Sequence, residues 1–136
     1  TGLIGPNGAG KTTLFTLVSG FQAPSAGRVL FAGEDVTGET PERLALRGIA
    51  RTFQIVQPFA GLTVLENVAV GAYLRHPGRA EAMAHAEAVA RSVGLADLGR
   101  PAASLTVAGR KRLELARALA TGPRLLLLDE VLAGLN

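Results

Sequence analysis

A glycine-rich segment near the start of the sequence has the residue types that hold phosphate groups. Residues 5–12 read Gly-Pro-Asn-Gly-Ala-Gly-Lys-Thr and fit the pattern G-x-x-x-x-G-K-[ST] without a gap. The glycines let the backbone curl with its N–H groups pointing inward, and a helix that begins near Lys11 adds the positive end of its dipole. The Lys11 ammonium can reach the β- and γ-phosphates of a nucleotide, and the Thr12 hydroxyl can ligate Mg²⁺. A glycine-rich turn that binds nothing is the alternative, but the strand pattern before the loop and the helix pattern after it favour a phosphate-binding loop.

A run of leucines near the other end of the sequence leads into two acidic residues. Residues 124–129 read Arg-Leu-Leu-Leu-Leu-Asp, which predicts a strand buried on both faces of a parallel sheet. Asp129 at the end of this strand can hold Mg²⁺ through water, and Glu130 can polarise an attacking water as a general base. An aliphatic strand that ends in two acids is ambiguous by itself. Together with the phosphate-binding loop, it indicates a site that hydrolyses a nucleotide.

The rest of the sequence alternates between strand and helix patterns, which is typical of the α/β class. From Leu62 onward an apolar stripe at helical spacing predicts a helix that ends at His76-Pro77-Gly78. Because the sequence starts and stops beside strand patterns, we expect a fragment that is truncated at both ends. Further helices are expected over residues 11–19, 40–47, 79–93 and 106–120, strands over residues 28–32 and 49–53, a turn at 33–35, and the end of a strand at 1–4.

The composition limits the class of protein. The chain has 136 residues, 48% of them hydrophobic, so a folded core is expected. It has no cysteine, which excludes a disulfide framework and a thiolate metal site. The net charge of +3 is mild, and we expect no nucleic-acid partner. The aliphatic run at residues 125–128 is far too short to cross a bilayer, so attachment to a membrane would need a partner protein.

Several strings in the sequence resemble the ATP-binding subunits of ABC transporters. Residues 2–14, Gly-Leu-Ile-Gly-Pro-Asn-Gly-Ala-Gly-Lys-Thr-Thr-Leu, resemble their Walker A region, and residues 48–54, Gly-Ile-Ala-Arg-Thr-Phe-Gln, resemble their Q-loop strand. Residues 33–37, 50–54 and 133–136 are more narrowly similar to the ATPase subunits of branched-chain amino-acid importers. Three further stretches resemble the start of the helical subdomain, the helix after the signature motif, and the D-loop: residues 62–68, 113–119 and 133–136.

The resemblance implies a P-loop NTPase core with a mostly parallel sheet, formed by residues 1–58 and 122–136, and a helical subdomain inserted at about residues 60–121. It implies ATP and Mg²⁺ as cofactors, a catalytic role for Glu130 and Gln54, and a metal site at Thr12, Gln54 and Asp129. Nucleotide contacts are implied for Gly5, Pro6, Asn7, Gly8, Ala9, Gly10, Lys11, Thr12 and Thr13, and across a dimer for Thr106, Ala108 and Gly109.

The resemblance also implies partners. ATP would lie between the phosphate loop of one subunit and the signature motif of a second ABC ATPase subunit, in a head-to-tail dimer. The other partners would be membrane permease subunits and, indirectly, a solute-binding protein. The chain would then lie peripherally on the cytoplasmic face of the bacterial inner membrane, where ATP hydrolysis would power import of branched-chain or related amino acids.

Two positions depart from the family pattern. The signature motif, usually Leu-Ser-Gly-Gly-Gln, reads Leu-Thr-Val-Ala-Gly at residues 105–109, and Val131 stands where proline is usual. The adenine-stacking aromatic and the switch histidine of the family are also missing from the sequence. Neither His76 nor His85 can be that histidine, because both precede Asp129.

Two other functions stay open at this point. Soluble ABC-class ATPases of DNA repair or translation carry the same motifs, but they usually insert long coiled coils or basic linkers, and the segment at residues 60–105 is short. A nucleotide-sensing module without turnover is the second alternative. The intact set of Lys11, Thr12, Asp129 and Glu130 weighs against it.

Overall fold

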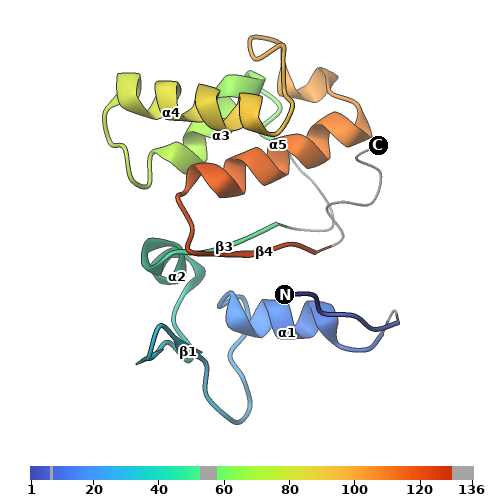
Figure 1. Ribbon diagram of the computed structural model, residues 1–136, viewed down its shortest axis with the longest axis vertical. Coiled ribbons are helices and arrows are strands. Elements are labelled where there is room, and N and C mark those ends of the chain that lie inside the picture. Colours follow the sequence, from blue (N-terminus) through green and yellow to red (C-terminus); the bar gives the residue numbers. More distant parts are fainter. Residues whose placement is uncertain (7, 53–57, 130–136) are drawn as a thin grey trace.

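The computed structural model describes residues 1–6, 8–52 and 58–129. In Figure 1, three helices stack above a pair of strands, while a small hairpin and the first helix lie below. None of the helices in the described part of the chain has both the length and the apolar character that a bilayer crossing requires. In chain order the elements are α1 (Lys11–Val18), β1 (Leu30–Phe31), β2 (Glu34–Asp35), α2 (Pro41–Arg47), β3 (Ile49–Arg51), α3 (Val64–Ala72), α4 (Arg79–Ser92), the 3₁₀ turn η1 (Ala102–Ser104), α5 (Val107–Ala120) and β4 (Leu125–Leu127).

Helices α3, α4 and α5 form the upper layer and share one hydrophobic core. The α4 side chains that are fully buried in this core are all small, Ala82, Ala86 and Ala90, and Met83 and Val89 pack against it from the same helix. A Cβ at Gly71 of α3 would collide with the carbonyl oxygen of Arg117 in α5, so glycine allows these two helices to touch. The expected helical stripe after Leu62 is confirmed, and the three helices form a compact unit.

A second, smaller core lies under the strands. Val36, Leu44 of α2 and Ile49 of β3 are buried together, and leucines of β4 pack against them. Helix α2 begins as expected, because the Thr40 hydroxyl accepts a hydrogen bond from the Arg43 N–H at 3.3 Å and proline occupies the first helical position.

Strands β3 and β4 pair in parallel, with Ile49 opposite Leu125. The expectation that the leucine strand is buried on both faces is wrong for this chain: Leu125–Leu127 are half-buried and Leu128 is 37% exposed. The reason is that, among the described residues, β4 pairs with β3 alone. Its other edge therefore has no neighbouring strand whose side chains would cover the leucines. Residues 1–3 line a hollow together with residues 125–128, but residues 1–4 form no strand.

The hairpin corrects a second expectation. Glu34 and Asp35 were expected in a turn, but they form β2, which pairs antiparallel with β1. The turn is shorter and consists of Ala32 and Gly33, whose φ angles are 52° and 83°. Two consecutive residues with positive φ match the right-handed twist of the flanking strands, which is why such turns close short hairpins.

Candidate nucleotide and metal site

The phosphate-binding loop takes the curled conformation that its glycines predict. Gly8 and Gly10 have φ angles of 85° and 94°, in the left-handed region that other residues avoid. Gly10 is also the N-cap of α1, and as a glycine it has no side chain to cap the first N–H groups of the helix. Such free N–H groups at a positive helix end attract anions.

Gly5 serves the loop for a different reason. The sequence interpretation gave it the same backbone role as Gly8 and Gly10, but its φ lies outside the left-handed region. A Cβ at Gly5 would lie 3.0 Å from the Cβ of Ala9, closer than ordinary contact. Glycine therefore lets the two arms of the loop approach each other, and the Ala9 N–H donates to the Pro6 carbonyl oxygen at 3.1 Å inside it.

Lys11 closes the loop. Its ammonium donates a hydrogen bond to the carbonyl oxygen of Gly5, six residues earlier, so the side chain folds back along the loop that it follows. Lys11 is half-buried, whereas Thr12 and Thr13 are exposed. A phosphate at the N-terminus of α1 would offer this ammonium a charged acceptor in place of a neutral carbonyl, which is the stronger hydrogen bond.

The two motifs at opposite ends of the sequence meet in space. The Thr12 hydroxyl donates to Oδ2 of Asp129 at 3.0 Å, although 117 positions separate them. Asp129 is buried, with 7% of its surface exposed. A hydroxyl and a carboxylate are oxygen ligands of the kind that Mg²⁺ prefers, and Mg²⁺ usually keeps several waters and takes few protein ligands. Among the described residues, no three or more His, Cys, Asp or Glu side chains are grouped so that they could hold a metal ion.

Two residues that the sequence reasoning did not assign complete this region. Thr52 is fully buried, and its hydroxyl accepts from the Asp129 N–H at 3.4 Å, which ties the end of β4 to the end of β3. The Arg51 guanidinium lies 3.9 Å from Asp129 Oδ2. The one sequence signal for Arg51 was that an arginine lies inside a strand that leads to Gln54. Strand periodicity does not reveal that Asp129 is the side chain next to this arginine.

Three of the predicted site residues, Asn7, Gln54 and Glu130, lie outside the described residues. Their assignments stay predictions. Val131, which stands where proline is usual in the family, lies outside the described residues as well.

Comparison with known proteins decides the family. Residues 1–133 match the sequence model described as ABC transporter. The chain belongs to the ABC transporter family.

Three ABC relatives with curated names show how far the likeness extends. The chain is 38% identical to the high-affinity branched-chain amino acid transport ATP-binding protein BraF of Pseudomonas aeruginosa and 37% identical to LivG of Escherichia coli, in each case over 98% of the chain and 59% of the relative. It is 42% identical to the sulfate/thiosulfate import ATP-binding protein CysA of Mycolicibacterium paratuberculosis, over 100% of the chain and 37% of the relative. The chain thus spans less than two thirds of these proteins.

Solved ABC cassettes confirm the fold. The ATP-binding cassette MJ1267 of an ABC transporter matches with a TM-score of 0.82 at 34% identity, over 98% of this chain and 58% of that one. A dimeric structure of the cassette MJ0796 bound to ADP and Pi matches with a TM-score of 0.84 at 25% identity, over 96% and 60%. The expected P-loop NTPase fold with a parallel sheet and a helical subdomain is therefore confirmed.

The segment predicted to be the signature motif lies at the start of α5. Thr106 is the N-cap of α5, and its hydroxyl oxygen accepts from the Gly109 N–H at 3.1 Å. This bond uses a lone pair of the oxygen, so the hydroxyl hydrogen can still be donated. Ala108 and Gly109 line a hollow of about 310 Å³ whose described lining residues all lie between positions 94 and 112. The structure does not bring the signature residues to Lys11 or Thr12 within one chain.

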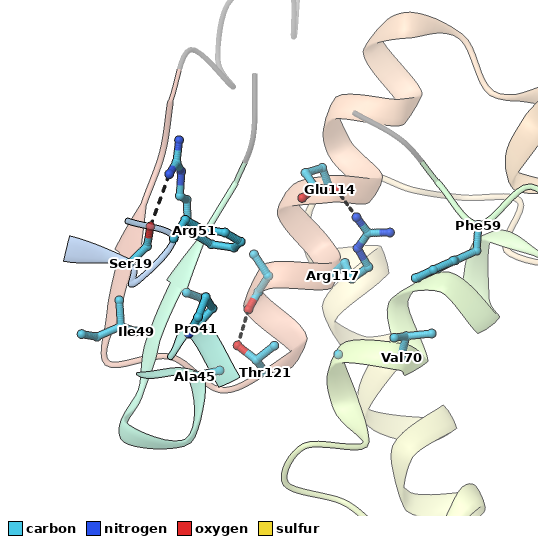
Figure 2. Close-up of a pocket in the computed structure, with 14 residues that line it drawn as sticks. Ser19, Pro41, Ala45, Ile49, Arg51, Phe59, Val70, Glu114, Arg117 and Thr121 are labelled. Carbon is cyan, nitrogen blue, oxygen red and sulfur yellow. Dashed lines mark hydrogen bonds and ion pairs between the residues drawn. The ribbon is translucent and has the colours of Figure 1, made fainter. Parts of the chain in front are cut away.

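A groove separates the ABC helical subdomain from the strands (Figure 2). Its volume is about 360 Å³, and it is lined by residues of α2, β3, α3 and α5, by Ser19 and Phe21 after α1, and by Phe59. Glu114 of α5 is 5% exposed and forms an ion pair with Arg117, whose guanidinium lies 5.2 Å from the centre of the Phe59 ring. Burial raises the pKa of Glu114, and the charge and hydrogen bond of Arg117 oppose this rise. The groove therefore combines apolar walls with the Glu114–Arg117 ion pair.

Proposed function

We propose that this chain is the ATP-binding and hydrolysing part of an ABC importer subunit that takes up branched-chain or related amino acids. The observation that carries the ATPase assignment is the Thr12–Asp129 hydrogen bond, because it joins the phosphate loop to the acidic strand end. In a protein with a glycine-rich turn that binds nothing, a buried carboxylate would not be expected beside the first turn of the helix that follows the turn. The proposed cofactors are ATP and Mg²⁺.

In this proposal each residue has a defined task. The N–H groups at the start of α1 and the Lys11 ammonium bind the β- and γ-phosphates, while Thr12 and Asp129 hold the metal. Mg²⁺, when bound, neutralises charge on the phosphate oxygens. Glu130, directly after Asp129 in the sequence, would orient the attacking water and accept its proton, and Gln54, which follows β3 in the sequence, would contact the metal.

The proposed solute rests on the names of the relatives. BraF and LivG are named for branched-chain amino acid transport, and each spans nearly the whole of this chain, but CysA is named for sulfate and thiosulfate import. The sequence strings at residues 33–37 and 50–54 favour the amino-acid class. The peripheral position on the cytoplasmic face of the inner membrane belongs to the same proposal.

A transport assay tests the proposal. The complete protein would be assembled with its permease subunits and its solute-binding protein in lipid vesicles, and uptake of labelled leucine or sulfate would be measured with and without Mg-ATP. We expect ATP-dependent uptake of leucine only. Uptake of sulfate alone would overturn the solute assignment, and absence of ATP hydrolysis would overturn the ATPase assignment.

The isolated position of the signature residues supports a head-to-tail dimer as the working form. Thr106 presents a hydroxyl and a helix N-terminus, which suits a phosphate oxygen, and the phosphate it meets would belong to the ATP of a second subunit. Val107 and Ala108 add a Cβ where the family usually has glycine, so we propose a working but weakened signature motif.

Changing Thr106 to alanine is expected to slow hydrolysis on the partner subunit's phosphate loop and to spare ATP binding by the mutated subunit. The expected loss is about tenfold or more, since one hydrogen bond to a charged group contributes about 1.5–3 kcal/mol. The measurement is nucleotide occupancy and turnover in an assembled transporter with one mutated subunit. Unchanged turnover at the partner's site would mean that this signature is vestigial.

The groove between the strands and the helical subdomain is the proposed docking site for the membrane permease. Phe59 is half-exposed at its edge, and the helical subdomain begins just after it. We expect Phe59→Ala to reduce co-purification with the permease, because an exposed aromatic is a typical anchor at an interface. Tyr73→Ala, an exposed aromatic that is not among the groove residues, is the control. If only the control weakens the complex, the docking surface lies elsewhere.

A further inference from the structure

Arg51 is a buried arginine whose contacts join two elements of the nucleotide site. Its side chain is 7% exposed. Its Nη1 donates to the hydroxyl oxygens of Thr16 at 3.0 Å and Ser19 at 3.3 Å, which lie in and just after α1, the helix that follows the phosphate loop. Figure 2 shows this side chain beside Ser19. Its Nη2 lies 3.9 Å from Oδ2 of Asp129, a distance that permits charge attraction but is too long for a hydrogen bond.

The register of the sheet fixes this arrangement. Arg51 is the last residue of β3 and lies opposite Leu127, two positions before Asp129. The Thr52 N–H donates to the Leu127 carbonyl oxygen at 3.0 Å, which continues the ladder to the end of both strands. Arg51 and Asp129 therefore lie close together because of the backbone pairing, and not because of a flexible side chain.

The charged forms of Arg51 and Asp129 stabilise each other. A buried carboxylate is costly unless a positive group accompanies it, and Arg51 supplies that group at Asp129. Burial lowers the pKa of Arg51, and the attraction of Asp129 opposes this fall. A Mg²⁺ ion beside Thr12 and Asp129 would give the carboxylate a second cation, and it would also repel the guanidinium. The charge of Arg51 thus stabilises the metal-free site more than the metal-bound site.

We propose that Arg51 is a positioning residue that balances the charge of Asp129 while Mg²⁺ is absent and thereby weakens the binding of the metal. The proposal rests on the proposed function, since it requires Mg²⁺ at Thr12 and Asp129. Because binding equilibria are reciprocal, a residue that favours the metal-free state must reduce metal affinity by the same factor. Arg51 would thus keep the site formed between turnovers and let the metal leave with the product.

The test compares ATP affinity with excess Mg²⁺ and with excess EDTA, measured with a fluorescent ATP analogue on the complete protein. The ratio of the two dissociation constants reports how much Mg²⁺ strengthens binding, without any turnover. We expect this ratio to be larger in Arg51→Gln than in the wild type by about fivefold or more, the lower end of ordinary coupling between sites. The amide of glutamine can still donate to Thr16 and Ser19, so the change removes mainly charge.

Two controls separate charge from hydrogen bonding. Arg51→Lys keeps the charge, and Ser19→Ala removes one acceptor of Arg51 while leaving its charge, so both ratios are expected to stay near that of the wild type. Circular dichroism checks folding, and Arg51→Met replaces Arg51→Gln if the latter does not fold. An unchanged or smaller ratio in the uncharged variant overturns the inference. A wild-type protein whose ATP binding does not respond to Mg²⁺ would instead overturn the proposed function.

Discussion

Lys11→Ala is expected to weaken ATP binding and abolish turnover. The N–H groups at the start of α1 remain in the variant, but they carry only partial charges and cannot neutralise the β- and γ-phosphates. Loss of a charge-assisted hydrogen bond costs about 1.5–3 kcal/mol, which corresponds to a roughly 10- to 150-fold higher dissociation constant. Isothermal titration calorimetry with ATP on the complete protein measures the affinity, and phosphate release measures the turnover.

The sequence offers a matched control for this change. The chain contains one other lysine, Lys111 of α5, outside the phosphate loop. Lys111→Ala removes the same group and should leave ATP affinity near the wild-type value. Equal ATP affinity in Lys11→Ala and the wild type would contradict the assignment of residues 5–12 as the phosphate loop.

Glu130→Gln is expected to keep ATP affinity and to slow hydrolysis by a factor on the order of 10² or more, as the loss of a general base does. The amide retains the size of the side chain, so the nucleotide should still bind, and the ATP-bound dimer should accumulate. Size-exclusion chromatography with ATP would show the dimer, and a phosphate-release assay would show the loss of turnover.

An exposed glutamate provides the comparison for Glu130. Glu81 lies on the solvent side of α4, and Glu81→Gln should leave both the rate and the elution volume unchanged. Normal turnover in Glu130→Gln would mean that another residue is the general base, whereas loss of ATP binding would mean that Glu130 has a structural role.

The parts of the fold that local chemistry controls could be predicted from the sequence. The helix after the phosphate loop, the helix starts near Thr40 and Thr106, and the break at residues 76–78 all follow from short-range rules, and the structure confirms them. The hairpin turn was predicted to begin at Gly33, but it begins one residue earlier, because the sequence pattern did not reveal that Ala32 takes a positive φ. The exposure of Leu128 was also missed, because burial depends on neighbouring strands and not on the apolar run itself.

The candidate site divides in the same way. The phosphate loop and Asp129 could be predicted because their motifs have a fixed spacing and a strand pattern before them in the sequence. Arg51 and Thr52 could not, since their roles depend on the register between β3 and β4, which no local pattern encodes. A residue that works through a partner more than seventy positions away can be recognised only once the two strands are paired.

The pairing of β3 with β4 also bears on the order in which the chain folds. Ile49 and Leu125 lie side by side, yet the whole helical subdomain separates them in the sequence. Helices α3, α4 and α5 bury their core mainly against one another, so they can assemble from local contacts before the long loop closes. Arg51, Thr12 and Asp129 would then come together last. Nucleotide would bind only to chains that have completed this step, and ATP would thus select and stabilise the fully folded molecule.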